Sequence, residues 1–496
     1  MSALQALKTK LADINALEAA GAVLDWDQQT YMPPKAVEAR ARHASVLGRL
    51  AHEMWTSDEL QTLLGRAEAE AEPGSVDAAL VRIVRRETSL KTKIPAQLVE
   101  RKAQLAALGH EVWVEARAAS DFGKFAPTLA EMVDIVREEA NCLGVGDSIY
   151  DPLLDQYEEG STAADVRTMF ETIKQPTVDL VRAIRETNTQ PDTGRLIGEW
   201  DQGRASEFTL KVVQAIGFDL QRGRQDVAPH PFCTNFSVND VRLTTRFKPY
   251  IGSAIFGSLH EAGHGMYEQG SPEEWDGTPL AGGVSLGVHE SQSRLWENIV
   301  GRSRAFWEHF LPSLQGSFPE LDHYNLDSFY AAVNKVEPSL IRVEADELTY
   351  NLHILLRFEI ELGMLEGTLA IKDLPEAWNE KMREYLGIVP PNDAQGCLQD
   401  VHWSGGSIGY FPTYSMGNLL SYQIWARLQQ DIPNTDELMA KGHFAPIFEW
   451  LRERIYAQGS RYTPKDLVVR VTGKPMGADD WMAGMKSKYS TLYRLA

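Results

Sequence analysis

Apolar residues recur at steps of three and four along most of this 496-residue chain, which is the period of an α-helix with one buried face. The segments 37–55 and 126–144 show the pattern clearly, and the second ends at Gly144, a residue that commonly stops helices. Chains dominated by this one period bury their helical faces against other helices. We therefore expect a single, large, mainly α domain over residues 1–496, with two lobes around a cleft.

Other segments refine this expectation. Residues 463–473 and 479–496 are predicted helices, and 328–367 is predicted to be a long helical tract that is interrupted or kinked at Pro338. Strand-like alternation is scarce, and its best candidate is 240–250, as an edge strand or part of a hairpin. The sequence therefore predicts little β structure.

The stretch "SLHEAGHGMYEQG" places His260 and His264 four residues apart, with Glu261 directly after the first histidine. In an α-helix this spacing puts both imidazoles on one face, about 6 Å apart along the axis, where they can converge on one metal ion. Glu261 can then reach the water that such a metal activates. The alternative is an amphipathic helix in which the histidines are merely hydrogen-bonded.

Two glycines and the next acidic segment bear on this choice. Gly263 and Gly265 each cost a helix about 1 kcal/mol relative to alanine, which suggests that a neighbouring element approaches the backbone closely. Catalytic zinc takes three protein ligands, and Glu290, 26 residues beyond the second histidine, is the expected third. Glu297 is the fallback. His289 could also be a ligand, but on a helix it points about 100° away from Glu290.

Composition and chain pattern exclude several classes of function. A formal net charge of −20 argues against binding to nucleic acid. No apolar run is long enough for a membrane-spanning helix, and the first residues lack a secretory signal pattern. Three scattered cysteines without a CxxC pair predict neither disulfides nor a thiolate metal site. We expect a cytoplasmic protein, with loops at 270–287 and 387–418 lining its site.

The sequence resembles the carboxypeptidase Taq family of zinc metallocarboxypeptidases. The resemblance begins with HEAGH followed at this distance by "HESQ" at 289–292. Further motifs of the family occur in the expected order: "HPF" at 230–232, "DVRLT" at 240–244, "IRVEAD" at 341–346 and "GCLQDVHW" at 396–403, with "DWDQQTYMPP" at 25–34 and "VTGKPM" at 471–476 in the flanks.

The resemblance implies a mainly α, saddle-like fold related to neurolysin and angiotensin-converting enzyme, with a deep central groove and usually a homodimer. It also implies stepwise removal of C-terminal amino acids from peptides, with broad specificity. By motif, one zinc ion per chain would be bound by His260, His264 and Glu290, with Glu261 as the general base. A nitrogen and oxygen ligand set of this kind also accepts cobalt or manganese.

A metallopeptidase needs hydrogen-bond donors to the tetrahedral oxyanion besides the metal. His402, in "QDVHW", and Tyr410, in "GGSIGYFPTY", are the candidates, because a glycine-rich loop can bring a tyrosine over the ion. Tyr414 competes with Tyr410 for this role. Aromatic packing is the alternative for either tyrosine.

Recognition of a free α-carboxylate is the other requirement, and a guanidinium group meets it well. Arg242 and Arg342 lie inside the matching motifs and are the candidates, although without the motifs an arginine is more often a structural ion-pair partner. Asp346, one helical turn after Arg342, is expected to hold or pair with that arginine, and Asp240 to brace Arg242. His230 is a further candidate for substrate contact.

Two other functions compete with the carboxypeptidase. One is an oligoendopeptidase of the neurolysin kind, which cuts internal bonds of short peptides. The other is a helical peptide-binding protein without catalysis, and the presence of Glu261 beside the histidines argues against it.

Overall fold

The computed structural model describes residues 2–144 and 146–495, and most of them lie in helices. The chain divides into two compact units. The first unit comprises Met1–Thr92, Asp192–Val333 and Ile424–Pro475, and the second comprises Lys93–Pro191, Asn334–Gln423 and Met476–Ala496. The mainly α class predicted from the periodicity is confirmed. The prediction of one domain with two lobes around a cleft stays a prediction.

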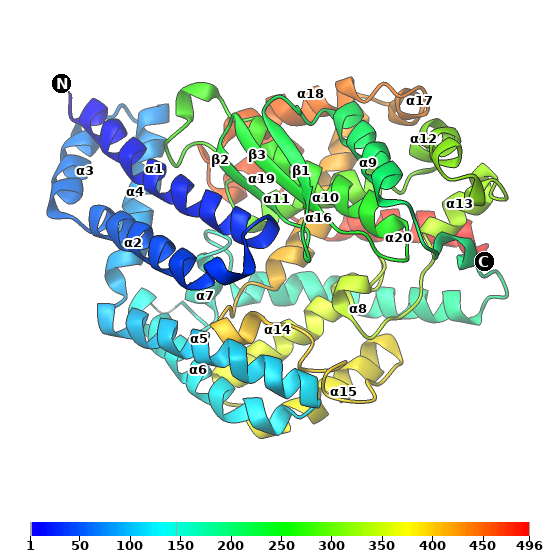
Figure 1. Ribbon diagram of the computed structural model, residues 1–496, viewed down its shortest axis with the longest axis horizontal. Coiled ribbons are helices and arrows are strands. Elements are labelled where there is room, and N and C mark those ends of the chain that lie inside the picture. Colours follow the sequence, from blue (N-terminus) through cyan, green and yellow to red (C-terminus); the bar gives the residue numbers. More distant parts are fainter. Residues whose placement is uncertain (1, 145, 496) are drawn as a thin grey trace. The chain divides into compact units, whose positions relative to one another are not determined.

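The first unit contains the short β-sheet and the helices around it (Figure 1). Its helices are α1 (Ala3–Thr30), α2 (Val37–Trp55), α3 (Asp58–Glu70), α4 (Val76–Lys93), α9 (Gln202–Ile216), α10 (Gly252–Gln269), α11 (Leu286–Arg294), α12 (Arg304–Ser317), α13 (Leu326–Val333), α17 (Thr435–Ala440), α18 (Ala445–Arg454) and α19 (Pro464–Thr472). A π-helical turn, Leu295–Val300, continues α11 directly.

The second unit is helical throughout its regular elements. Its helices are α5 (Ala96–Ala119), α6 (Phe122–Leu143), α7 (Asp151–Asp155), α8 (Ala163–Glu186), α14 (Tyr350–Glu366), α15 (Leu374–Leu386) and α20 (Asp479–Tyr493), and the unit boundary at Gln423 falls within α16 (Pro412–Asp431). Buried aromatic and aliphatic side chains from these helices form one core, with Trp378 and Trp481 among the largest.

The β-sheet of the first unit has three strands in the order β1–β3–β2. These are β1 (Gly223–Val227), β2 (Cys233–Ser237) and β3 (Asp240–Thr245); β3 runs parallel to β1 and antiparallel to β2. The predicted hairpin at 240–250 is confirmed as β2–β3. The predicted edge position is wrong, because β3 is the central strand.

Successive side chains of each strand point to opposite faces of this sheet, and helices pack against them. Leu243 of β3 faces α10, where a Cβ atom added at Gly265 would lie 2.7 Å from the Leu243 Cδ2 atom. Arg242, the preceding residue, faces the other way, and its guanidinium lies 4.8 Å from the ring centre of Trp26 in α1. The helix that carries HEAGH therefore packs on one face of the sheet, and Arg242 belongs to the opposite face.

Helices occur in all four of the shorter segments in which the sequence predicts them. The expected helices at 37–55, 126–144, 463–473 and 479–496 appear as α2, most of α6, α19 and α20. The tract at 328–367 is more than kinked at Pro338, because α13 ends at Val333 and α14 begins only at Tyr350. No helix among the described residues is both long and apolar enough to cross a membrane.

Candidate metal centre

Helix α10 presents the three polar residues of HEAGH from one stretch of buried helix. His260 and His264 lie one turn apart, with ring centres 4.9 Å from each other, and Glu261 is 5% exposed. Gly263, directly before His264, leaves room for a neighbouring helix. A Cβ atom at Gly263 would lie 2.6 Å from the carbonyl oxygen of Gln292, in α11. The close approach expected from the glycines is confirmed for Gly263, and the approaching helix is the one that follows.

Helix α11 begins at a serine cap, Ser285, and supplies Glu290. The Oε2 atom of Glu290 lies 3.6 Å from Nε2 of His260 and 3.5 Å from Nε2 of His264. One ligand atom from each of the three residues can be chosen so that all lie within 4.8 Å of one another. Tetrahedral zinc with bonds of about 2.0–2.1 Å holds its ligand atoms about 3.3 Å apart, so the Glu290 oxygen already lies near that spacing from each imidazole nitrogen.

Glu297, the alternative third ligand, occupies a different place. Its Oε2 atom is 2.9 Å from Nδ1 of His260, the ring nitrogen on the other side from Glu290. Glu290 lies in α11, whereas Glu297 lies inside the π-helical turn that follows it, where the helical spacing differs from that of an α-helix. Arg294 joins them, donating to Glu290 at 2.6 Å and to Glu297 at 3.3 Å. Arg294 was not singled out from the sequence, although its position four residues after Glu290 is the usual spacing of a helical ion pair.

Burial and charge set the ionisation of this group. Burial raises the pKa of Glu261 to about 7 and lowers that of His264 to about 4. For Glu290, burial alone would raise the pKa, but Arg294 and the two imidazoles outweigh it and hold the pKa far below its usual range. An ionised Glu290 carboxylate and a neutral His264 imidazole are the forms in which these two residues bind a cation.

The expected substrate residues of the first unit lie elsewhere. Arg242 donates to Asp240 through Nε and through Nη2, the latter at 3.0 Å, so the expected bracing by Asp240 is confirmed. The Arg242 guanidinium also lies 5.3 Å from the ring centre of Phe236. His230 is exposed in the loop before β2.

Arg342 belongs to the second unit and is 5% exposed. It donates to Asp400 at 2.8 Å through Nη2 and to the hydroxyl of Tyr350 at 2.8 Å through Nη1. The expectation that Asp346 holds this arginine is wrong. Arg342 lies in a 3-10 turn rather than an α-helix, and Asp346 instead accepts hydrogen bonds from the backbone and hydroxyl of Thr349.

The candidate oxyanion donors lie together in the second unit. The ring of Tyr410 is 5.5 Å from that of His402 and 5.3 Å from that of Tyr414, between centres. Burial lowers the pKa of His402 to about 4, so its imidazole is neutral at physiological pH. Within the expected loop at 387–418, His402–Gly405 form a 3-10 turn, and α16 begins at Pro412. The expectation of a loop is therefore wrong for 412–418.

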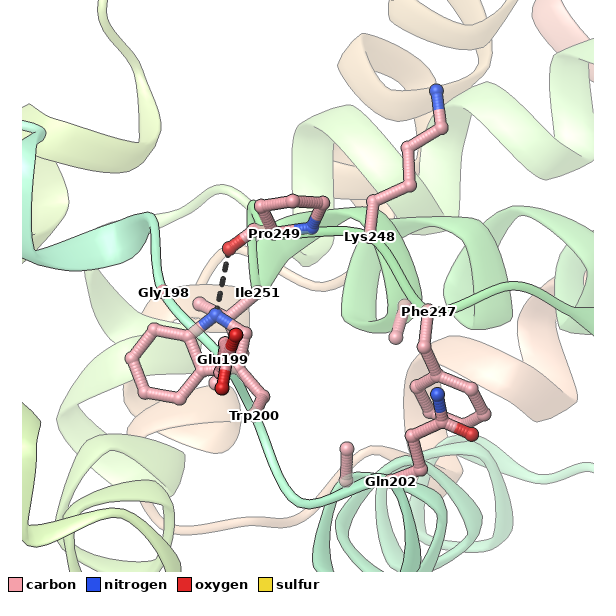
Figure 2. A pocket seen from close by; sticks show the side chains of 10 residues that line it. Gly198, Glu199, Trp200, Gln202, Phe247, Lys248, Pro249 and Ile251 are labelled. Atoms are coloured by element: carbon pink, nitrogen blue, oxygen red, sulfur yellow. Dashed lines mark hydrogen bonds between the residues drawn. The ribbon is translucent and has the colours of Figure 1, made fainter.

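A separate hollow of about 250 Å³ lies between the loop before α9 and the start of α10 (Figure 2). Trp200 closes part of it by donating its indole N–H to the carbonyl of Pro249 at 2.7 Å. Its lining is Gly198, Glu199, Trp200, Gln202, Ala205, Phe247, Lys248, Pro249, Ile251 and Ala254. These residues include none of those expected to bind metal or substrate.

Comparison with known proteins agrees with this site. The family model described as carboxypeptidase Taq (M32) metallopeptidase matches residues 6–489. Thermostable carboxypeptidase 1 of Thermus thermophilus is 42% identical over 490 residues, covering 96% of each chain. Carboxypeptidase 1 of Bacillus subtilis is 36% identical over 488 residues, covering 98% of this chain and 97% of its own.

Solved structures of this family are also similar to this chain. The crystal structure of an M32 carboxypeptidase from Deinococcus radiodurans R1 superposes with a TM-score of 0.97 at 39% identity, over 99% of this chain and 100% of that chain. This chain belongs to the carboxypeptidase Taq (M32) family of metallopeptidases. It is accordingly a metallocarboxypeptidase, a hydrolase of peptides.

Proposed function

We propose that the chain is a zinc-dependent carboxypeptidase that removes amino acids one at a time from the free C-terminus of peptides, with broad side-chain specificity. The observation that carries the proposal is the convergence of the Nε2 atoms of His260 and His264 on one oxygen of Glu290. Two imidazoles and one carboxylate are the ligand set of zinc peptidases. One ion per chain is expected, and cobalt or manganese would fit the same ligands.

The chemistry that zinc supplies when bound is activation of water and polarisation of the scissile carbonyl. Glu261 is proposed to accept a proton from the attacking water and to deliver it to the leaving amine. Its raised pKa of about 7 supports this role, since a base works best when its pKa lies near the working pH. Its position directly after His260 keeps it beside the ligands without making it one.

The remaining roles are proposed from the motifs. His402 and Tyr410 are the proposed donors to the oxyanion, with Tyr414 as the alternative to Tyr410. Arg242 and Arg342 are the proposed partners of the substrate carboxylate, and His230 a further substrate contact. Both arginines also fit the role of structural ion-pair partner, because each already pairs with an aspartate.

We also propose a cytoplasmic location and a homodimer. The cysteine pattern favours a reducing compartment, since the three thiols are unpaired. The homodimer rests on the family resemblance, and analytical ultracentrifugation tests it directly.

A pair of peptides tests the direction of cleavage. The two peptides have one sequence and differ only in a free or an amidated C-terminus. A carboxypeptidase releases the terminal residue from the first and leaves the second intact, because it must recognise the α-carboxylate. Equal turnover of both peptides, with internal fragments, would instead identify an oligoendopeptidase.

A further inference from the structure

The imidazole of His264 has a polar neighbour on each side. Its Nε2 atom faces Glu290, and its Nδ1 atom lies 2.6 Å from Nδ1 of His289. The other nitrogen of His289, Nε2, lies 2.6 Å from Oε1 of Glu268. The three side chains therefore form a continuous chain of hydrogen bonds that begins at the candidate metal ligand and ends at a carboxylate.

Glu268 is held firmly at the far end of this chain. It is 8% exposed and lies one helical turn after His264 on α10. The side-chain amide of Asn235, in β2, donates to its Oε2 atom, and the backbone N–H of Gly283 donates to Oε1 at 3.4 Å. Each of these partners is a donor, so Glu268 acts only as an acceptor.

The carboxylate fixes the direction of every bond in the chain. Because Glu268 accepts, Nε2 of His289 must carry its proton, and in the neutral ring Nδ1 is then an acceptor. Nδ1 of His264 must therefore donate, which leaves the lone pair of its Nε2 atom free. That lone pair is the one directed at Glu290, where a metal would bind.

We propose that His289 and Glu268 are positioning residues that select the metal-binding tautomer of His264. The proposal rests on the ligand assignment made under the proposed function. It also explains the histidine of "HESQ", which lies beside the ligand Glu290 and does not belong to the ligand group.

The two histidine ligands are thus supported differently. His260 donates from Nδ1 directly to the carboxylate of Glu297, at 2.9 Å. His264 reaches its carboxylate, Glu268, only through the ring of His289. Hydrogen-bond partners of this kind typically change metal affinity by about 10–100-fold when they are removed.

Zinc affinity of the Glu268→Gln variant tests the proposal. The amide can donate as well as accept, so it no longer requires the proton to stay on Nε2 of His289. We expect zinc, measured by competition with a chromophoric chelator, to bind about 10–100-fold more weakly than to the parent protein. Asp226→Asn is the matched control, since Asp226 is a buried carboxylate of the same unit, paired with Arg224. It should leave zinc affinity unchanged.

A double-mutant cycle with His289→Ala separates this role from a merely structural one. If Glu268 acts through His289, Glu268→Gln should cost little further affinity once His289 is absent. Additive losses, or unchanged affinity in Glu268→Gln, would overturn the proposal.

The tautomer itself is visible by NMR of the metal-free protein labelled with ¹⁵N in its histidine rings. We expect the His264 signals, identified by their loss in His264→Ala, to show a proton on Nδ1 in the parent protein and a mixture in Glu268→Gln. A proton on Nε2 in the parent protein would refute the tautomer assignment. Failure of the parent protein to bind zinc would refute the proposed function instead, and the NMR result would still decide the tautomer.

Discussion

Helix α11 approaches the backbone of α10 closely at Gly263, and replacing this glycine by alanine should displace a ligand helix. The added Cβ atom would lie 2.6 Å from the carbonyl oxygen of Gln292 and 2.6 Å from Cα of Ser293. Ordinary carbon contacts are about 3.5–4.0 Å, so α11 must move by about 1 Å. Such overpacking costs about 1–3 kcal/mol, and backbone atoms cannot rotate away to reduce it.

Gly257, in the same helix, provides the control for this substitution. Its added Cβ atom would meet only Pro231, at 4.0 Å. Both variants gain the same helix propensity, up to about 1 kcal/mol. Urea unfolding of the metal-free proteins should therefore place Gly263→Ala about 1–3 kcal/mol below Gly257→Ala. Because Glu290 moves with α11, zinc affinity should fall by at least about tenfold in Gly263→Ala only. Equal stability and unchanged affinity in the two variants would refute the close packing of α10 on α11.

Three further predictions concern single side chains. Glu261→Gln should abolish peptide hydrolysis while zinc content, measured by atomic emission, stays at one per chain; substantial residual activity would contradict its role as the base. Glu290→Ala should lose zinc on dialysis, whereas Glu297→Ala should retain zinc with weakened affinity. Loss of zinc from Glu297→Ala and its retention by Glu290→Ala would instead make Glu297 the third ligand. Arg294 and His260 hold the pKa of Glu297 at about 2 against the opposing effect of burial, below its usual 4.5. Its stabilising contribution is therefore present above about pH 4.5 and is lost as the pH falls through about 2. Metal-free Glu297→Gln should then lose less stability than the parent protein between about pH 5 and pH 3 in urea unfolding, and equal losses would contradict the assignment.

The grouping of His260, His264 and Glu290 could be predicted because the signals for it are local in the sequence. The spacing of His260 and His264 requires only one turn of helix to bring the two rings together. Gly263 indicated the approach of a second helix, and that helix supplies Glu290. The spacing could also have revealed Glu268, four residues after His264 on the same face, yet it was not singled out.

Partners that are distant in sequence could not be predicted. Arg342 was expected to pair with Asp346 on one helix, but it pairs with Asp400, which only the tertiary fold brings near. The strands β1 and β2 are short and polar, with no alternation to mark them, so β3 was expected at an edge. The π-helical turn Leu295–Val300, which contains Glu297, could not be predicted from the sequence either.

The central claim is that the group of His260, His264 and Glu290 makes this chain a metal-dependent exopeptidase acting from the C-terminus. A time course on an unmodified peptide, followed by mass spectrometry with and without a chelator, tests it most directly. We expect a ladder of products that lose one C-terminal residue at a time, which disappears with chelator and returns when zinc is added. Internal fragments, or a ladder that persists in excess chelator, would contradict it.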